Sequence, residues 1–188
     1  HLIAGMNSGF APQRIVRFVA YDFLVATNRG TRGDDYREFR NSLDRLKGTT
    51  LKTNIVSGGK RITKAFSLIE SYEIVERGPT ESRMSAIEIT LSTWLFEAIQ
   101  AMEVLTLNPG YFQLRKSLER RLYEIARKHV GMQDMWLIGL DTLAKKCGCT
   151  ASRLRKFRES IRQISHENRL PDYRVELLDG VKVLFSRR

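Results

Sequence analysis

Polar and charged side chains recur at helical spacing in LRKFRESIRQI, from Leu154 to Ile164. At about 100° per residue, Leu154, Phe157, Ile161 and Ile164 fall on one apolar side. The opposite side carries cations, one acid and hydrogen-bonding groups: Ser152, Arg155, Lys156, Glu159, Arg162 and Gln163. Arginine and lysine bind guanine edges or phosphates, and glutamine pairs with adenine. The chemistry this face can do is therefore the reading of a DNA major groove.

A charged helix face is also common on surfaces that only meet water. The formal net charge of +11 over 188 residues favours a polyanionic partner, either nucleic acid or an anionic membrane surface. No apolar run reaches the roughly 18 residues of a transmembrane helix, so we expect no membrane partner. The two cysteines of C-G-C form no disulfide framework, which is typical of the reducing cytoplasm.

Catalytic or metal-binding constellations are not evident. The histidines, which strand nicking would need as a pair beside a metal and a tyrosine, are isolated as His1, His129 and His166. Gly59-Lys60 lacks both the upstream glycine and the following Ser or Thr of a phosphate-binding loop. Cys147 and Cys149 would need two further metal ligands, and a small core residue is the simpler interpretation of Cys147. We expect no enzyme activity, metal or cofactor.

A second version of the same helix lies earlier, in YREFRNSLDRL from Tyr36 to Leu46, and shares Arg-x-Phe-Arg-x-Ser. Its inward residues are predicted to be Tyr36, Phe39, Leu43 and Leu46. Its outer side carries two cations and three acids among Asp34, Arg37, Glu38, Asn41, Asp44 and Arg45. Phosphates flank a major groove and repel acids, so this copy is less suited to groove insertion and better suited to protein or backbone contact.

Each helix follows a short helix that ends at a glycine, Gly30 or Gly148, which predicts two helix-turn-helix units. Each is followed by a hairpin pattern, LKTNIV-SGGK-RITKAF in the first copy and YRVELL-DG-VKVLF in the second. A helix-turn-helix with a hairpin wing is a winged helix. The predicted fold class is α+β, with tandem winged-helix domains.

The breaker Asn108-Pro109-Gly110 places the predicted domain boundary, giving domains 1–110 and 111–188. The second domain has a leading helix at about 114–130, whose equivalent in the first domain is missing or reduced to residues near His1. With a chain that does not begin at Met, this indicates N-terminal truncation. Between the units we expect a further strand pair, SYEIVE and SAIEITL, around the turn GPTES, then a short helix starting near Ser92.

The predicted DNA-binding residues extend beyond the outer face of the later helix. Its own arginines Arg153 and Arg158, and Lys182 in its wing, belong to the same set. In the first unit, the wing supplies a predicted phosphate clamp of Lys52, Lys60, Arg61 and Lys64. The alternative is a solvated hairpin whose lysines protect a sheet edge. A further basic band precedes the later unit and consists of Arg115, Lys116, Arg120, Arg121, Arg127 and Lys128.

Three stretches carry a family resemblance: residues 21–55, from YDFLVATNRG to LKTNI, residues 88–129, from EITLSTWLFEAIQ to EIARKH, and PDYRVELLDG. They resemble bacterial plasmid replication initiators of the replication initiator protein A family, over nearly the whole chain. The resemblance implies two winged-helix domains that bind repeated sites (iterons) in double-stranded plasmid origin DNA, help to open the duplex and recruit host helicase machinery. It also implies that the first domain handles dimerisation and backbone contacts while the second reads bases.

Other functions stay open. A winged-helix transcriptional regulator, such as an autorepressor, would use the same scaffold and the same type of site. An interaction module that holds a helicase loader, a host initiator protein or a second copy of the chain is favoured by the mixed-charge face of 36–46. A nicking enzyme is the third class, and the histidine pattern argues against it.

Overall fold

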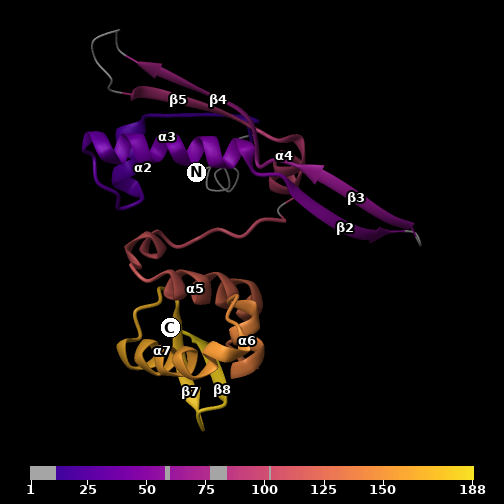
Figure 1. Ribbon diagram of the computed structural model, residues 1–188, viewed down its shortest axis with the longest axis vertical. Coiled ribbons are helices and arrows are strands. Elements are labelled where there is room, and N and C mark those ends of the chain that lie inside the picture. Colours follow the sequence, from indigo (N-terminus) through magenta and orange to yellow (C-terminus); the bar gives the residue numbers. More distant parts are fainter. Residues whose placement is uncertain (1–11, 58–59, 77–83, 102) are drawn as a thin grey trace. The chain divides into compact units, whose positions relative to one another are not determined.

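The structure is a computed structural model that describes residues 12–57, 60–76, 84–101 and 103–188. The chain divides into two compact units, His1–Val104 and Leu105–Arg188 (Figure 1). Each unit has buried apolar residues of its own. No helix among the described residues is long and apolar enough to cross a bilayer. The expected leading helix near His1, the turn at Gly58-Gly59 and the turn GPTES lie outside the described residues.

The second unit is a winged helix built around one three-stranded antiparallel sheet, with strand order β6-β8-β7. Its elements are α5 (Ser117–Val130), β6 (Met135–Gly139), α6 (Leu140–Lys146), a 3-10 turn (Ala151–Arg153), α7 (Leu154–Glu167), β7 (Tyr173–Leu178) and β8 (Lys182–Arg187). The wing turn places Asp179 and Gly180 at φ +49° and +67°, as a two-residue hairpin turn requires. The predicted second unit is confirmed, with strand β6 in place of the apolar entry expected before its first short helix.

The core of the second unit forms where the apolar stripes of its helices meet the sheet. Leu122 of α5 and Ile161 of α7 are fully buried, and so are Val183 and Phe185 of β8. On α5, Leu122 and Ile125 are buried, whereas Leu114 is buried before the helix begins at Ser117 and not at 114 as predicted. This burial fixes α7 to the sheet by one side only and leaves the other side free.

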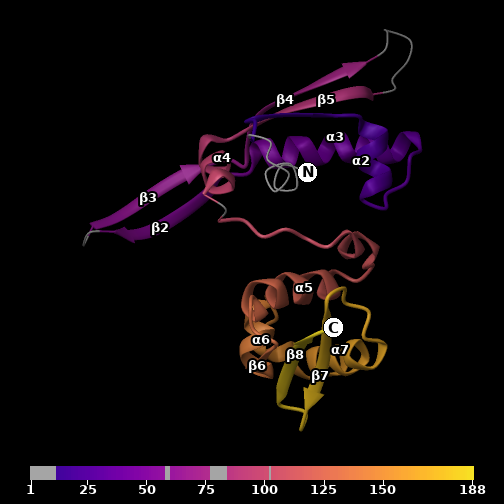
Figure 2. The same ribbon diagram turned by 180° about the vertical axis from the view of Figure 1, so that it is seen from behind.

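The first unit contains the second three-stranded sheet and a separate hairpin (Figure 2). Its elements are β1 (Ile15–Phe18), α2 (Ala20–Ala26), α3 (Gly33–Gly48), β2 (Leu51–Ser57), β3 (Lys60–Phe66), β4 (Ile69–Glu76), β5 (Met84–Leu91) and α4 (Thr93–Gln100). The predicted middle strand pair and the helix after Ser92 are present, and the Ser92 hydroxyl caps α4 by accepting the Leu95 N–H at 3.3 Å. Strand β1 was not predicted.

The wing of the first unit is not the hairpin that the sequence suggested. The sheet order β1-β5-β4 matches β6-β8-β7, so β4–β5 occupies the wing position. The hairpin β2–β3 pairs only with itself and is an insertion between α3 and the true wing. Both views show it extending away from α3 beyond α4 (Figures 1 and 2). Sequence proximity misled the assignment, because β1 pairs with β5 across more than 70 residues, as Arg17 does with Glu88.

The turn of each helix-turn-helix unit contains one residue in the left-handed region. In the second unit it is Gly148, with φ +75°, as predicted. In the first unit it is Asn28, with φ +54°, and not Gly30. A Cβ atom at Gly30 would overlap the carboxylate of Asp35, which would then have to move. That carboxylate accepts the backbone N–H of Arg32 at 2.8 Å and caps the start of α3.

The division between the units falls at Val104–Leu105 and not at residue 110. The segment that precedes the predicted boundary is bound to the second unit by hydrogen bonds. The backbone N–H of Asn108 donates to the hydroxyl of Tyr123 at 2.9 Å, and Arg127 Nε donates to the carbonyl of Thr106 at 3.0 Å. The Asn-Pro-Gly breaker interrupts secondary structure, but the chain still packs on the second unit at that point.

Candidate nucleic-acid interface

Helix α7 presents the predicted polar face to solvent. Phe157, Ile161 and Ile164 are buried against the core, and Leu154 is half-buried. Arg153 is exposed in the turn before the helix. All six residues predicted on the opposite side are exposed as well, namely Ser152, Arg155, Lys156, Glu159, Arg162 and Gln163. The packing stripe therefore holds α7 with its cations outward.

The cations of α7 are mostly unpaired. Arg155 Nε lies 4.0 Å from Glu159 across one helical turn, which is a weak, exposed contact. Within the part of the chain that the structure describes, Arg153, Lys156 and Arg162 make no side-chain hydrogen bond or ion pair. Three guanidinium or ammonium groups are thus available for phosphates or base edges.

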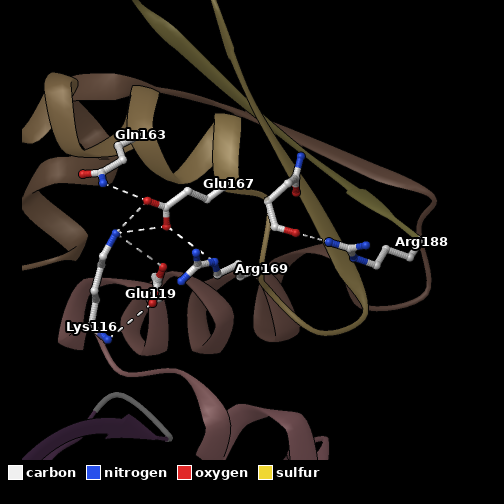
Figure 3. A network of polar contacts seen from close by, with 7 residues as sticks. Lys116, Glu119, Gln163, Glu167, Arg169 and Arg188 are labelled. Carbon is white, nitrogen blue, oxygen red and sulfur yellow. Dashed lines mark hydrogen bonds and ion pairs between the residues drawn. The ribbon is translucent and has the colours of Figure 1, made fainter.

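Two residues of α7 that were predicted to bind DNA are not both exposed and unpaired. Arg158 is half-buried, and its Nε makes no hydrogen bond within the described residues. Gln163 is exposed, but its Nε2 donates to Glu167 Oε1 at 2.7 Å (Figure 3). Glu167 in turn accepts from Lys116 Nζ at 3.1 and 3.2 Å. This network was not predicted, because Lys116 lies far from Gln163 along the chain.

The wing of the second unit adds a cation near its tip. Lys182 is exposed at the start of β8, opposite Leu178 in the register. The neighbouring turn at Asp179-Gly180 brings the backbone round in two residues. Lys182 is therefore exposed beside the wing turn, and its contact with a phosphate stays a prediction.

Helix α3 differs from α7 in electrostatics although it shares its packing. Tyr36, Phe39 and Leu43 are buried as predicted, but Leu46, in the last turn of the helix, is 37% exposed. Two cations on its outer side pair with acids of the same helix. Arg37 pairs with Asp34, and Arg45 Nη2 lies 3.3 Å from Glu38. These ion pairs neutralise two cations of α3, whereas the cations of α7 are mostly unpaired within the described residues.

The basic hairpin β2–β3 carries its described lysines on opposite faces. Lys52 and Lys64 are both exposed. Lys64 stands opposite Thr53, and consecutive residues of a strand point to opposite faces, so Lys52 points the other way. The side chains of Lys60 and Arg61 lie outside the described residues. The two described lysines therefore point to opposite faces of the hairpin, and the clamp of four cations stays a prediction.

The base of this hairpin is attached to α4 by aromatic stacking. The rings of Phe66 and Trp94 lie 4.1 Å apart at 21°. Beside them a shallow cavity of about 540 Å³ is lined by both signs of charge, including Lys47, Lys64 and Glu97. The Lys47 ammonium is already bound by the Glu70 carbonyl. The stacked rings hold the base of the hairpin against α4. The cavity is lined by both acidic and basic side chains, so it is not specific for an anion.

Much of the predicted basic band before α7 is used within the protein. Arg120 Nε donates to the Leu114 carbonyl at 2.8 Å, and Arg121 donates to the Lys146 carbonyl at 3.0 Å. Arg121 also pairs with Glu124 at 3.1 Å. These arginines brace α5 against its neighbours. The sequence could not distinguish such internal donors from free surface cations.

Cys147 and His129 play packing roles. Cys147 packs against the core, and burial raises the pKa of its thiol to about 11, so it is a poor thiolate ligand at neutral pH. His129 stacks on Trp136 with ring centroids 4.5 Å apart, and burial lowers the pKa of its imidazole. No group of three or more potential metal ligands occurs among the described residues.

Comparison with known proteins agrees with this architecture. A family model described as "Replication initiator protein A" matches residues 1–175. The chain belongs to the replication initiator protein A family. A relative from Wigglesworthia glossinidia brevipalpis, described as "Putative replication protein", is 39% identical over 178 residues. The match covers 93% of this chain and 64% of that relative, so the chain spans about two thirds of the relative's length.

Solved structures show the same fold at low sequence identity. Domains 2 and 3 of RctB superpose with a TM-score of 0.70 and 13% identity, over 99% of this chain and 77% of that one. The Pi initiator protein, solved in complex with iteron DNA, gives a TM-score of 0.65 and 12% identity, over 93% of this chain and 81% of that one. The predicted α+β fold of winged-helix units and the predicted family are both confirmed.

Proposed function

We propose that this chain is a replication initiator that binds repeated sites in double-stranded plasmid origin DNA, with α7 as the helix that reads bases. The observation that carries the proposal is the free cationic face of α7, with Arg153, Lys156 and Arg162 exposed and unpaired within the described residues. A helix held by its apolar side and cationic on the other suits a major groove between two rows of phosphates.

The comparisons support the same proposal from a different direction. The relative from Wigglesworthia carries the description of a replication protein, and the Pi initiator was solved with iteron DNA. The proposed role needs no catalytic step of its own. The protein binds, promotes opening of the duplex and recruits host helicase or initiator proteins in the cytoplasm.

The two winged helices divide the work in this proposal. The second reads bases through α7 and meets phosphates through Lys182. The first, whose α3 cations are paired with acids, contacts the DNA backbone through Lys52 or Lys64, or holds a second copy of the chain. Acidic side chains on a groove-facing helix would be repelled by phosphates, which is why α3 is assigned to contacts outside the groove.

Footprinting on the DNA that flanks the gene tests the proposal. Regularly spaced protected repeats, together with maintenance of an origin-less plasmid by the gene and those repeats, are the expected result. Failure of the purified chain to protect any flanking DNA at low salt would contradict DNA reading by α7.

A transcriptional regulator on the same scaffold is the alternative. It is favoured by the same feature, since a free cationic recognition helix serves a promoter site equally well. A single protected palindrome over the promoter, with no plasmid maintenance, would favour the regulator over the initiator. Cleavage of supercoiled DNA with a divalent metal would instead indicate a nicking enzyme.

A further inference from the structure

The side-chain amide on the outer face of α7 is held by a network that reaches α5. Gln163 Nε2 donates to Glu167 Oε1 at 2.7 Å, one helical turn along. Figure 3 shows the amide nitrogen turned toward Glu167 and the amide oxygen turned away from it. An amide that is free on a helix surface can rotate and exchange its donor and acceptor positions. Glu167 prevents this exchange only if its own position and charge are fixed.

Glu167 is itself fixed from two sides. Its side chain is only 19% exposed, and Lys116 Nζ contacts its two oxygens at 3.1 and 3.2 Å. Arg169 Nε approaches Oε2 to 3.7 Å. Hydrogen bonds from Lys116 and then from Gln163 lower the pKa of this carboxyl group, so it is ionised at neutral pH. An ionised carboxylate accepts hydrogen bonds and cannot donate one.

Lys116 is anchored in turn at the start of α5. Its backbone N–H donates to Glu119 Oε2 at 3.3 Å, and its ammonium lies 4.0 Å from Glu119 Oε1. Glu119 is 3% exposed, so it cannot swing out to release the lysine. The ammonium stands between two carboxylates and links the first turn of α5 to the last turn of α7.

The orientation of Gln163 follows from the charge of its partner. Because Glu167 only accepts, Gln163 must offer it an N–H, and the carbonyl oxygen and the second N–H are left for another molecule. One acceptor and one donor side by side are what the major-groove edge of adenine requires, at N6 and N7. Guanine, which presents two acceptors there, does not match this pair.

We propose that Glu167 is a specificity-determining positioning residue: anchored by Lys116, it locks the Gln163 amide in the orientation that selects an adenine. This inference rests on the proposed function, since it takes α7 to be the reading helix. Glu167 touches no base in this arrangement and acts only through Gln163.

A double-mutant cycle on the full chain tests the inference. The probes are duplexes of the footprinted site with each base pair substituted in turn, and the readout is the affinity ratio between the native and the substituted duplex. Gln163→Ala should lower this ratio at one A·T pair by about 5- to 150-fold, the range of one bidentate pair. Glu167→Gln keeps the shape but lets the amide of Gln163 turn over, and should lower the ratio at the same pair.

The double variant Gln163→Ala/Glu167→Gln should lose no more than Gln163→Ala alone, because both changes act through one contact. Glu176→Gln is the matched control, since it also removes one acid from the second unit, at an exposed position of β7 outside the reading face, without touching Gln163. Both variants should still bind random DNA, and only Glu167→Gln should relax the A·T preference. Binding to random DNA also shows that each variant is folded.

Three results overturn the inference. They are full base preference in Glu167→Gln, additive losses in the double variant, and no effect of Gln163→Ala at any base pair. In all three the native chain still prefers its site, so the proposed function stands. A native chain with no base preference at all would instead contradict the proposed function, and the inference with it.

Discussion

The hydroxyl of Tyr123 joins the segment before α5 to the start of the wing by donating a hydrogen bond to Asp172 Oδ2 at 2.9 Å. The hydroxyl oxygen of Tyr123 also accepts the backbone N–H of Asn108 at 2.9 Å. Asn108 Nδ2 donates to Asp172 Oδ1 at 2.6 Å. Tyr123 is fully buried and Asn108 is half-buried, whereas Asp172 is exposed. The triangle explains why residues after Val104 belong to the second unit.

Tyr123→Phe should destabilise the second unit by about 1–3 kcal/mol, because it leaves the half-buried Asn108 N–H without its partner. Urea-dependent hydrogen exchange of α5 peptides measures that free energy locally. Tyr21→Phe is the matched control, since Tyr21 is 47% exposed and its change should stay within about 0.5 kcal/mol. Equal stability of Tyr123→Phe and the native chain would contradict the role of the triangle.

The same hydroxyl should give the second unit an alkaline stability limit. Burial raises the pKa of Tyr123 from 10.0 to about 12. A group whose pKa is raised by folding stabilises the fold fully below its unfolded pKa and loses that contribution as pH rises toward the folded value. The stability gap between the native chain and Tyr123→Phe should therefore narrow from pH 10 to 12. Urea titrations at several pH values test this, and a constant gap would refute it.

Gly30→Ala should destabilise the first unit, because the new Cβ displaces the Asp35 carboxylate that caps Arg32. The expected loss is about 0.5–2 kcal/mol, the range for removing an N-terminal cap. Gly33→Ala is the control, since a Cβ there meets no atom within 4 Å. Thermal unfolding of both variants measures the loss of stability. An equal loss in Gly33→Ala and Gly30→Ala would contradict the capping role of Asp35.

The hairpin β2–β3 should contact DNA through one face only. Lys52 and Lys64 point to opposite faces, so their alanine variants should weaken binding unequally. Removing the lysine that contacts a phosphate should lower affinity evenly across sequences. It should also reduce the slope of log affinity against log salt concentration by about 1. Salt titrations of binding by Lys52→Ala and Lys64→Ala provide the measurement. Unchanged salt slopes in both variants would remove the hairpin from the interface.

Local patterns were sufficient for the parts of the fold that depend on near neighbours. The apolar spacing of Phe157, Ile161 and Ile164 predicted which side of α7 is buried, and Asp179-Gly180 predicted the second wing. The same helical spacing also predicted that the outer faces of α7 and α3 differ in charge. These features depend on helical period and turn chemistry, which a single sequence displays directly.

The long-range strand pairing could not be predicted from the sequence. The insertion of β2–β3 before the true wing cannot be seen locally, because both hairpins have strand patterns and only the pairing of β1 with β5 distinguishes them. Asn28 took the left-handed position expected of Gly30, since asparagine also tolerates that region. The contact of Lys116 with Glu167 joins residues that are 51 positions apart, and no spacing rule predicts it, whereas Gln163 and Glu167 are one helical turn apart on α7.

Arg155 and Arg37 occupy equivalent positions in the shared Arg-x-Phe-Arg-x-Ser pattern, and their alanine variants give the most direct test of the central claim. The measurement is the ratio of affinities for the origin site and for random DNA. Arg155→Ala should cost about 1–3 kcal/mol on the origin site and relax preference at one base pair. Arg37→Ala, whose arginine pairs with Asp34, should leave base preference intact. Equal losses of preference in the two variants would contradict the assignment of reading to α7.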